Sequence, residues 1–227
     1  MGSIAFQQGV AGDLPQASDF QIPQLRNASR EPAKMIYRIL HDESYLMHVI
    51  PPVESMTKLG EEHGTFAFNA EPKSYRDVWK PLEIEFRPCE GSKATEVPDV
   101  SENFGRLFLS ERAFEVLGEL LGQCGECLPV TFGGRKGYIF NPTLTAEQAG
   151  AVDNQLLSYD EHGNLSHFGF KEPNLLGVHV FKTELDLYKG VFCLESIKAA
   201  FTDANLTGIV FSEDASGPTG QAHGETH

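Results

Sequence analysis

Two segments of the chain each have the pattern of a strand, a short helix and a returning strand. In the first, residues 107–109 are apolar, Ser110 follows as a helix cap, and Glu111 favours the positive end of the helix dipole. Apolar residues then recur at the spacing of a buried helix face: Ala113, Phe114, Leu117, Leu120 and Leu121. Gly122 is expected to end this helix in a left-handed conformation, before a returning strand at residues 127–132.

The second segment repeats this order. Residues 191–193 are a predicted strand, residues 195–204 a short helix, and residues 209–211 the returning strand. Aligning residues 107–111 with residues 191–195 superposes the two segments. This match has two interpretations, an old internal duplication or a chance similarity between two strand–helix–strand units, and both stay open at this point.

Shorter patterns predict the other elements. Gly133 and Gly134 are expected to turn the strand at residues 127–132 back into a strand at residues 137–140. The polar segment 90–103 is expected to be a loop. Apolar and alternating patterns predict further strands at residues 34–40, 65–68, 82–86, 165–170 and 176–181.

Thr145 and Gln148 have the spacing of a capping box, in which each side chain satisfies a free backbone amide of the other residue. This pattern predicts a helix that begins after Thr145. Its apolar face would continue through Ala149, Val152 and Leu156.

Together these patterns predict a single α+β domain over residues 34–212. Its sheet is expected to be mixed and largely antiparallel, with short helices packed on it. Residues 1–33 and 213–227 are rich in small and polar residues and lack apolar periodicity. We therefore expect two disordered tails.

The charge of the chain excludes several classes of partner. There are 32 acidic and 18 basic residues, which give a formal net charge of -14. Such a chain repels phosphate backbones and anionic lipid surfaces, so neither nucleic acid nor membrane is expected as a partner. The four cysteines are expected to be reduced thiols, and the N-terminus lacks the basic and apolar regions of a signal peptide. The expected location is the cytoplasm.

The acidic residues are unevenly distributed. Residues 137–170 contain no Lys or Arg, yet carry Glu147, Asp153, Asp160 and Glu161. A region of one charge can steer a basic partner protein towards its binding surface. These four residues are the predicted partner-binding set. The alternative interpretation is a solvated face that serves solubility alone.

The sequence predicts no catalytic residue, metal or cofactor. Cys124 and Cys127 form a CxxC pair, but the pair follows a helix, where the dipole does not lower a thiol pKa. His162 and His167 do not complete a zinc site with the pair, because zinc sites use a second closely spaced pair of ligands. The glycine-rich residues 133–137 lack the spacing of a phosphate-binding loop.

One resemblance extends over residues 98–211. Its motifs are Pro98-Asp99, the helical segment 107–117, the strands at 128–130 and 138–141, and the segments 168–172, 191–198 and 206–211. In this order they resemble the "immunity protein eleven" family of bacterial polymorphic toxin systems. The resemblance implies a cytoplasmic antidote that binds a cognate toxin, such as a basic nuclease, and it implies no catalytic residues. The alternatives are an enzyme of unfamiliar type that uses Asp, Glu and His in loops, and a regulatory binding module unrelated to toxins.

Overall fold

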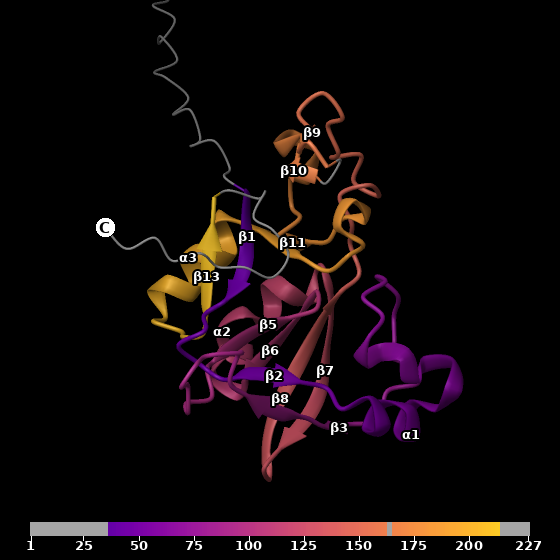
Figure 1. Ribbon diagram of the computed structural model, residues 1–227, viewed down its shortest axis with the longest axis vertical. Coiled ribbons are helices and arrows are strands. Elements are labelled where there is room, and N and C mark those ends of the chain that lie inside the picture. The colour runs from indigo at the N-terminus through magenta and orange to yellow at the C-terminus, as the bar shows by residue number, and fades with distance from the viewer. Residues whose placement is uncertain (1–35, 163–164, 214–227) are drawn as a thin grey trace, which may run out of the picture. The chain divides into compact units, whose positions relative to one another are not determined.

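Residues 36–162 and 165–213 are described by a computed structural model (Figure 1). They belong to one compact unit with an α+β fold and mostly antiparallel sheets, as predicted. The segment 1–33 and nearly all of the segment 213–227, the predicted tails, lie outside the described residues.

The sheet that contains β8 holds the first strand–helix–strand unit. Its strand order is β3-β7-β8-β6-β5. Gly133 and Gly134, both with positive φ, join β7 to β8 and confirm the predicted hairpin turn. The strands are β3 (Leu82–Glu83), β5 (Val100–Asn103), β6 (Arg106–Ser110), β7 (Gly125–Phe132) and β8 (Arg135–Pro142).

Helix α2 (Glu111–Gly122) connects β6 to β7. The Ser110 side chain accepts a hydrogen bond from the Ala113 amide at 3.1 Å, which confirms the predicted cap. The helix ends at Gly122, as predicted, but the predicted left-handed conformation is wrong. Gly122 does not have a positive φ, the following Gln123 caps the helix in a right-handed conformation, and the Cys124 amide continues the turn by donating to the Leu121 carbonyl.

The sheet that contains β1 holds the second unit. Its strand order is β11-β12-β1-β13, with α3 (Glu195–Asp203) between β12 and β13. The strands are β1 (Ile36–His41), β11 (Val180–Phe181), β12 (Val191–Leu194) and β13 (Ile209–Ser212).

The two units share a local topology. The strands that flank each helix lie parallel to one another, with one antiparallel strand between them. That strand is β8 between β6 and β7, and β1 between β12 and β13. The helices α2 and α3 contact each other and share an apolar core with residues of both sheets. Units of this topology recur in unrelated proteins, so the shared topology is compatible with both interpretations of the repeated pattern.

Further elements surround these units. Helix α1 (Pro52–His63) and the 3-10 helix η1 (Gly64–Ala67) lie beside β3 at the edge of the β8 sheet (Figure 1). β2 (Met47–Val49) pairs with β4 (Glu85–Arg87). β9 (Ser158–Tyr159) and β10 (Leu165–His167) form a hairpin at the top of Figure 1. The 3-10 helices η2 (Glu172–Leu175) and η3 (Glu184–Asp186) flank β11 along the chain.

The capping box forms, but the predicted helix does not. The Thr145 amide donates to the Gln148 side chain, and the Gln148 amide donates to Thr145, each at 3.1 Å. Gly150 then takes a positive φ, and Val152 bridges to Phe170 instead of continuing a helical face. Two reciprocal hydrogen bonds therefore stabilise a turn here, because tertiary pairing of the following residues overrides the local signal.

Other strand predictions also need correction. Residues 64–67 form η1, which buries Phe66 in a cluster with Tyr75 and Trp79. The predicted strand at 82–86 breaks at Ile84, because β3 and β4 join different sheets. Residues 100–103, which were expected to belong to a loop, form β5 and pair with β6. The strands predicted at 165–170 and 176–181 are shorter, as β10 and β11.

Candidate functional site

Three segments that are far apart in the sequence meet around an open groove of about 630 Å³. The first is residues 65–71, the second is the tip of the β5–β6 hairpin, and the third is residues 184–189, at and after η3. We call this hollow the aromatic groove. The aromatic, large apolar and charged residues of its lining are Phe68, Glu71, Phe104, Glu184, Leu187, Tyr188 and Lys189.

The aromatic groove exposes large apolar side chains. Phe68 is 54% exposed and Leu187 is 66% exposed, and the partly buried Phe104 and Tyr188 lie in the same lining. One exposed apolar side chain is ordinary on a protein surface. Several gathered in one hollow are typical of a surface that contacts another molecule.

The backbone of the groove is strained. Phe104, Leu187 and Tyr188 have φ values of 51°, 59° and 62°, in the left-handed region. Large side chains rarely adopt this conformation, which costs about 1–3 kcal/mol for each residue. Among the other described residues that are not glycine, positive φ occurs at Asn205, a residue type that tolerates it. The strain of the described chain is thus concentrated in this groove.

Hydrogen bonds hold the strained loop in place. The Leu187 amide donates to the Glu184 carbonyl and the Tyr188 amide to the Thr183 carbonyl, each at 2.9 Å. The Gly190 amide donates to the Asp186 carboxylate at 2.8 Å, and the same carboxylate lies 3.8 Å from the buried Arg38 guanidinium. The loop is therefore fixed by several independent contacts, as a strained conformation requires.

The hairpin tip and this loop are in direct contact. Gly105 has a φ of 73°, and a Cβ atom at this position would overlap the carbonyl oxygen of Tyr188. Glycine is therefore needed here both for its conformation and for the close approach of the two backbones. The contact places the hairpin tip directly beside the backbone of Tyr188.

Two buried cations support the floor of the groove. The Arg106 guanidinium donates to the Asn69 carbonyl at 2.6 Å, and the Lys182 ammonium donates to the Ala70 carbonyl at 3.0 Å. Burial lowers the pKa of Arg106 to about 10 and that of Lys182 well below its usual value. Arg106 also lies over the Phe66 ring, 3.9 Å from its centre. The floor is thereby fixed by bonds from groups fully shielded from water.

Carboxylates surround the Tyr188 end of the groove. Burial raises the pKa of the Tyr188 hydroxyl, and the negative charges of Glu184, Glu147 and Glu71 raise it further. Glu147 accepts hydrogen bonds from the Thr183 hydroxyl at 2.6 Å and the Glu184 amide at 2.9 Å. This end of the groove therefore has a negative potential.

The structure divides the four predicted partner-binding residues among different elements. Glu147 contacts the loop that forms the groove. Asp153 accepts a bond from the Gln155 amide in a turn, and Asp160 and Glu161 lie in the connection between β9 and β10. Asp160 accepts a bond from the amide of His162, and Glu161 is mostly exposed.

The CxxC cysteines lie in a connection between α2 and β7 and in β7 itself. Cys124 is buried, and its sulfur accepts a hydrogen bond from the His179 amide. Burial raises the pKa of Cys127 to about 11, which keeps its thiol protonated at neutral pH. Within residues 36–162 and 165–213, no group of three or more His, Cys, Asp or Glu side chains is arranged to hold a metal ion.

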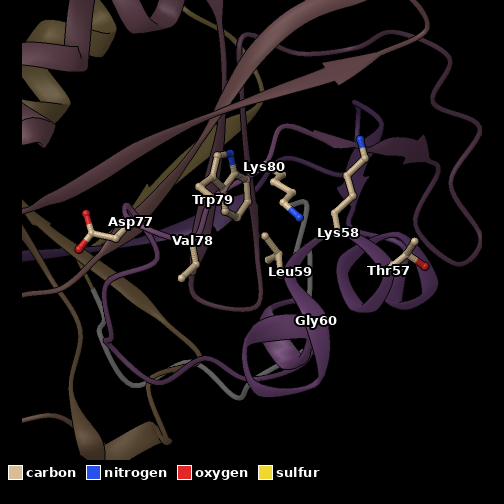
Figure 2. Close-up of a pocket in the computed structure, with 8 residues that line it drawn as sticks. All are labelled: Thr57, Lys58, Leu59, Gly60, Asp77, Val78, Trp79 and Lys80. Atoms are coloured by element: carbon tan, nitrogen blue, oxygen red, sulfur yellow. The ribbon is translucent and has the colours of Figure 1, made fainter.

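A second hollow, of about 450 Å³, lies between α1 and residues 77–80 (Figure 2). Two of its polar side chains have partners in the fold. Lys58 contacts Glu54 and donates to the Pro81 carbonyl, and the Trp79 indole donates to the Pro129 carbonyl of β7. Asp77 points away from the hollow in Figure 2. These contacts attach the segment to the β8 sheet, so we assign this hollow a structural role.

The sequence interpretation missed the aromatic groove. A local signal existed at Phe104-Gly105, because a glycine between two pairing strands is typical of a tight hairpin turn. Phe68, Leu187 and Tyr188 carry no such signal, since their exposure and conformation depend on tertiary contacts.

The groove combines aromatic faces, exposed apolar groups and carboxylates on a fixed backbone, a combination suited to binding. Among the described residues, no helix has the length and apolarity needed to cross a membrane. In comparisons with known proteins, no family model matches the chain and no curated protein matches it.

Proposed function

We propose that the protein is an antidote, which binds a toxin protein in the bacterial cytoplasm and neutralises it through a surface that includes the aromatic groove. The observation that carries the binding role is the joint presence of exposed aromatic groups and backbone strain in one groove. The resemblance of residues 98–211 to immunity proteins supports a toxin as the partner. Phe104 and residues 184–189 lie within the span 98–211, between the motifs that carry the resemblance.

Folding energy alone does not account for such a groove. Left-handed Phe104, Leu187 and Tyr188 reduce the stability of the free protein. The exposed Phe68 and Leu187 side chains do not offset this loss, because little of their apolar surface is buried. Large aromatic side chains on a preorganised surface contribute strongly to protein association. A binding role therefore supplies a reason for both features.

The charge of the chain supports a basic partner. A net charge of -14 accelerates encounter with a positively charged protein, such as a nuclease. In this proposal Asp153, Asp160 and Glu161 contribute to the encounter rate. The position of Glu147 beside the groove loop supports a role closer to the contact.

We expect this chain to protect a sensitive bacterial host that expresses the product of the adjacent gene, and to form a complex with that product in vitro. Growth curves and gel filtration measure the two results. Protection without a complex would contradict neutralisation by binding. Absence of both would contradict the antidote function itself.

The double substitution Phe68→Ser and Leu187→Ser is expected to weaken that complex by about 100-fold or more, because it removes two apolar anchors. The fold should persist, since both side chains are largely exposed. The matched control is Val53→Ser with Val210→Ser, two exposed apolar residues that do not line the groove. Equal affinity of the two double variants, measured by calorimetry, would place the contact surface elsewhere.

Phe104→Asn is expected to stabilise the free protein and weaken the complex. Asparagine followed by glycine suits a hairpin turn with two positive φ values, so the free energy of unfolding should rise by about 1 kcal/mol. Urea unfolding measures the gain. A loss of stability would show that Phe104 is needed for folding, and unchanged affinity would show that it does not contact the partner.

A further inference from the structure

The carboxylates of the aromatic groove are available to a partner. Glu71 and Glu184 are exposed at its lining, and Glu147 lies behind Glu184. Among the described residues, no ion pair within 4.0 Å involves Glu71 or Glu184. The Asn69 side chain donates to Glu71 at 3.3 Å, and the exposed Lys189 is the one basic residue of the lining, so the two carboxylates leave the lining with a net negative charge.

The groove also presents aromatic faces beside these charges. Phe68, Phe104 and Tyr188 line it, and the ammonium of Lys189 already lies 6.0 Å from the centre of the Phe104 ring. Attraction between a cation and a ring strengthens as water is excluded, and it adds to pairing with a carboxylate. The groove thus contains the two groups that together recognise an organic cation.

Other ligand classes fit this lining less well. An anion would meet Glu71 and Glu184 directly. The buried Arg106 and Lys182 do not offer an anion site, because they donate to backbone carbonyls of the floor and are shielded from the groove. A metal ion would need three or more converging ligands, and the described residues contain no such group.

We propose that the aromatic groove receives an arginine side chain of the partner protein. Its guanidinium would stack on Phe68 or Tyr188 and donate to the carboxylates of Glu71 and Glu184. A planar guanidinium suits this site better than an ammonium, because it stacks on rings and offers a fork of donors. The inference rests on the proposed function, because only that proposal identifies the partner as a protein.

Short peptides test this inference without the toxin. The probes are acetyl-Leu-Arg-Leu-amide and the same peptide with citrulline, lysine or glutamate in the central position. Each is titrated into the full chain, and amide shifts are followed by NMR. We expect the arginine peptide to shift residues 68–71, Phe104 and residues 184–189, with at least about tenfold higher affinity than the citrulline peptide at low salt.

Matched variants separate the groove from general acidity. Glu71→Gln with Glu184→Gln should abolish the preference for arginine over citrulline. Glu115→Gln with Glu119→Gln removes the same charge from the exposed face of α2 and should preserve that preference. The affinity for the arginine peptide should also fall at 0.5 M salt, because salt screens the attraction between the guanidinium and the carboxylates.

Several outcomes would overturn the inference. They are equal affinity for arginine and citrulline, equal affinity for arginine and lysine, preference for glutamate, or shifts outside the groove. If the peptides do not bind but the chain protects cells, the antidote function stands and the arginine site is contradicted. If the arginine peptide binds the groove but the chain does not protect cells, the arginine site stands and the antidote function is contradicted.

Discussion

Glu126→Leu is expected to lower the free energy of unfolding by about 4 kcal/mol. Glu126 is 4% exposed and lies in β7, between Cys124 and Cys127 in the sequence. Its carboxylate accepts bonds from the Tyr75 amide at 2.7 Å, the Asn141 side chain at 3.0 Å and the Ser74 hydroxyl at 2.8 Å. Leucine fills a similar volume but leaves three donors without an acceptor.

Such a loss is a large share of the total stability of a domain, which is about 5–15 kcal/mol. The melting temperature should fall by about 10 °C. Glu126→Gln is the matched control, because its carbonyl oxygen retains two of the bonds and its amide can donate to Ser74, so it should cost about 1 kcal/mol or less. Equal losses in the two variants would mean that the charge, and not its hydrogen bonds, stabilises the fold.

Two groups, the buried His48 and the partly buried Glu102, are expected to give the protein opposing responses to pH between 5 and 7. His48 is buried, and burial lowers its pKa from 6.5 to about 3. In this range the unfolded chain binds more protons at His48 than the folded chain does. Stability from His48 is therefore present above pH 6.5 and is lost as the pH falls, by about 2 kcal/mol at pH 5.

Glu102 acts in the opposite direction. Burial raises its pKa from 4.5 to about 7, against the lowering effects of the Gly105 amide, Arg38 and Lys182. The folded chain here binds more protons than the unfolded chain between pH 4.5 and 7. Stability from Glu102 is therefore present below pH 4.5 and falls as the pH rises, by about 2 kcal/mol between pH 5 and 7.

Single substitutions should expose the two contributions. Relative to the wild type, Glu102→Gln should gain about 2 kcal/mol more stability between pH 5 and 7, and His48→Asn should gain about 2 kcal/mol less. Asparagine keeps a polar atom near the Nδ1 position that contacts the Ser101 hydroxyl. Urea unfolding at both pH values gives the differences. The assigned pKa shifts would be contradicted if the change in unfolding free energy between pH 5 and 7 equalled that of the wild type in both variants. They would also be contradicted if both variants differed from the wild type in the same direction.

The sequence by itself determined the two strand–helix–strand units, because their signals are local. The Ser110 side chain caps α2 by accepting a hydrogen bond from Ala113, only three residues away. The apolar spacing of α2 matches its buried face at Ala113, Leu117 and Leu121. The hairpin at Gly133 and Gly134 is likewise set by the conformational freedom of these two residues. In such elements the deciding contacts lie within a few residues along the chain.

Tertiary structure decided the elements whose partners are distant. Ile84 donates its amide to Thr131, which divides one predicted strand between two sheets. Thr145 itself bridges to Lys182, and Val152 bridges to Phe170, so the capping box starts no helix. Between the two thiols of the CxxC motif lies the buried Glu126, whose hydrogen bonds reach residues 51 and 52 positions away along the chain.

The aromatic groove depends on tertiary structure most of all. Its three segments meet because Arg106 and Lys182 hold the backbone of residues 69–70, while Gly105 lets the Tyr188 carbonyl approach the hairpin tip. The glycine at residue 105 indicates a turn in the sequence, but no periodic or local pattern indicates that Arg106, Lys182 and Gly105 contact these distant segments. Exposure of Phe68 and the positive φ of Leu187 and Tyr188 follow from these distant contacts, because a surface formed by three separated segments exists only after the chain has folded.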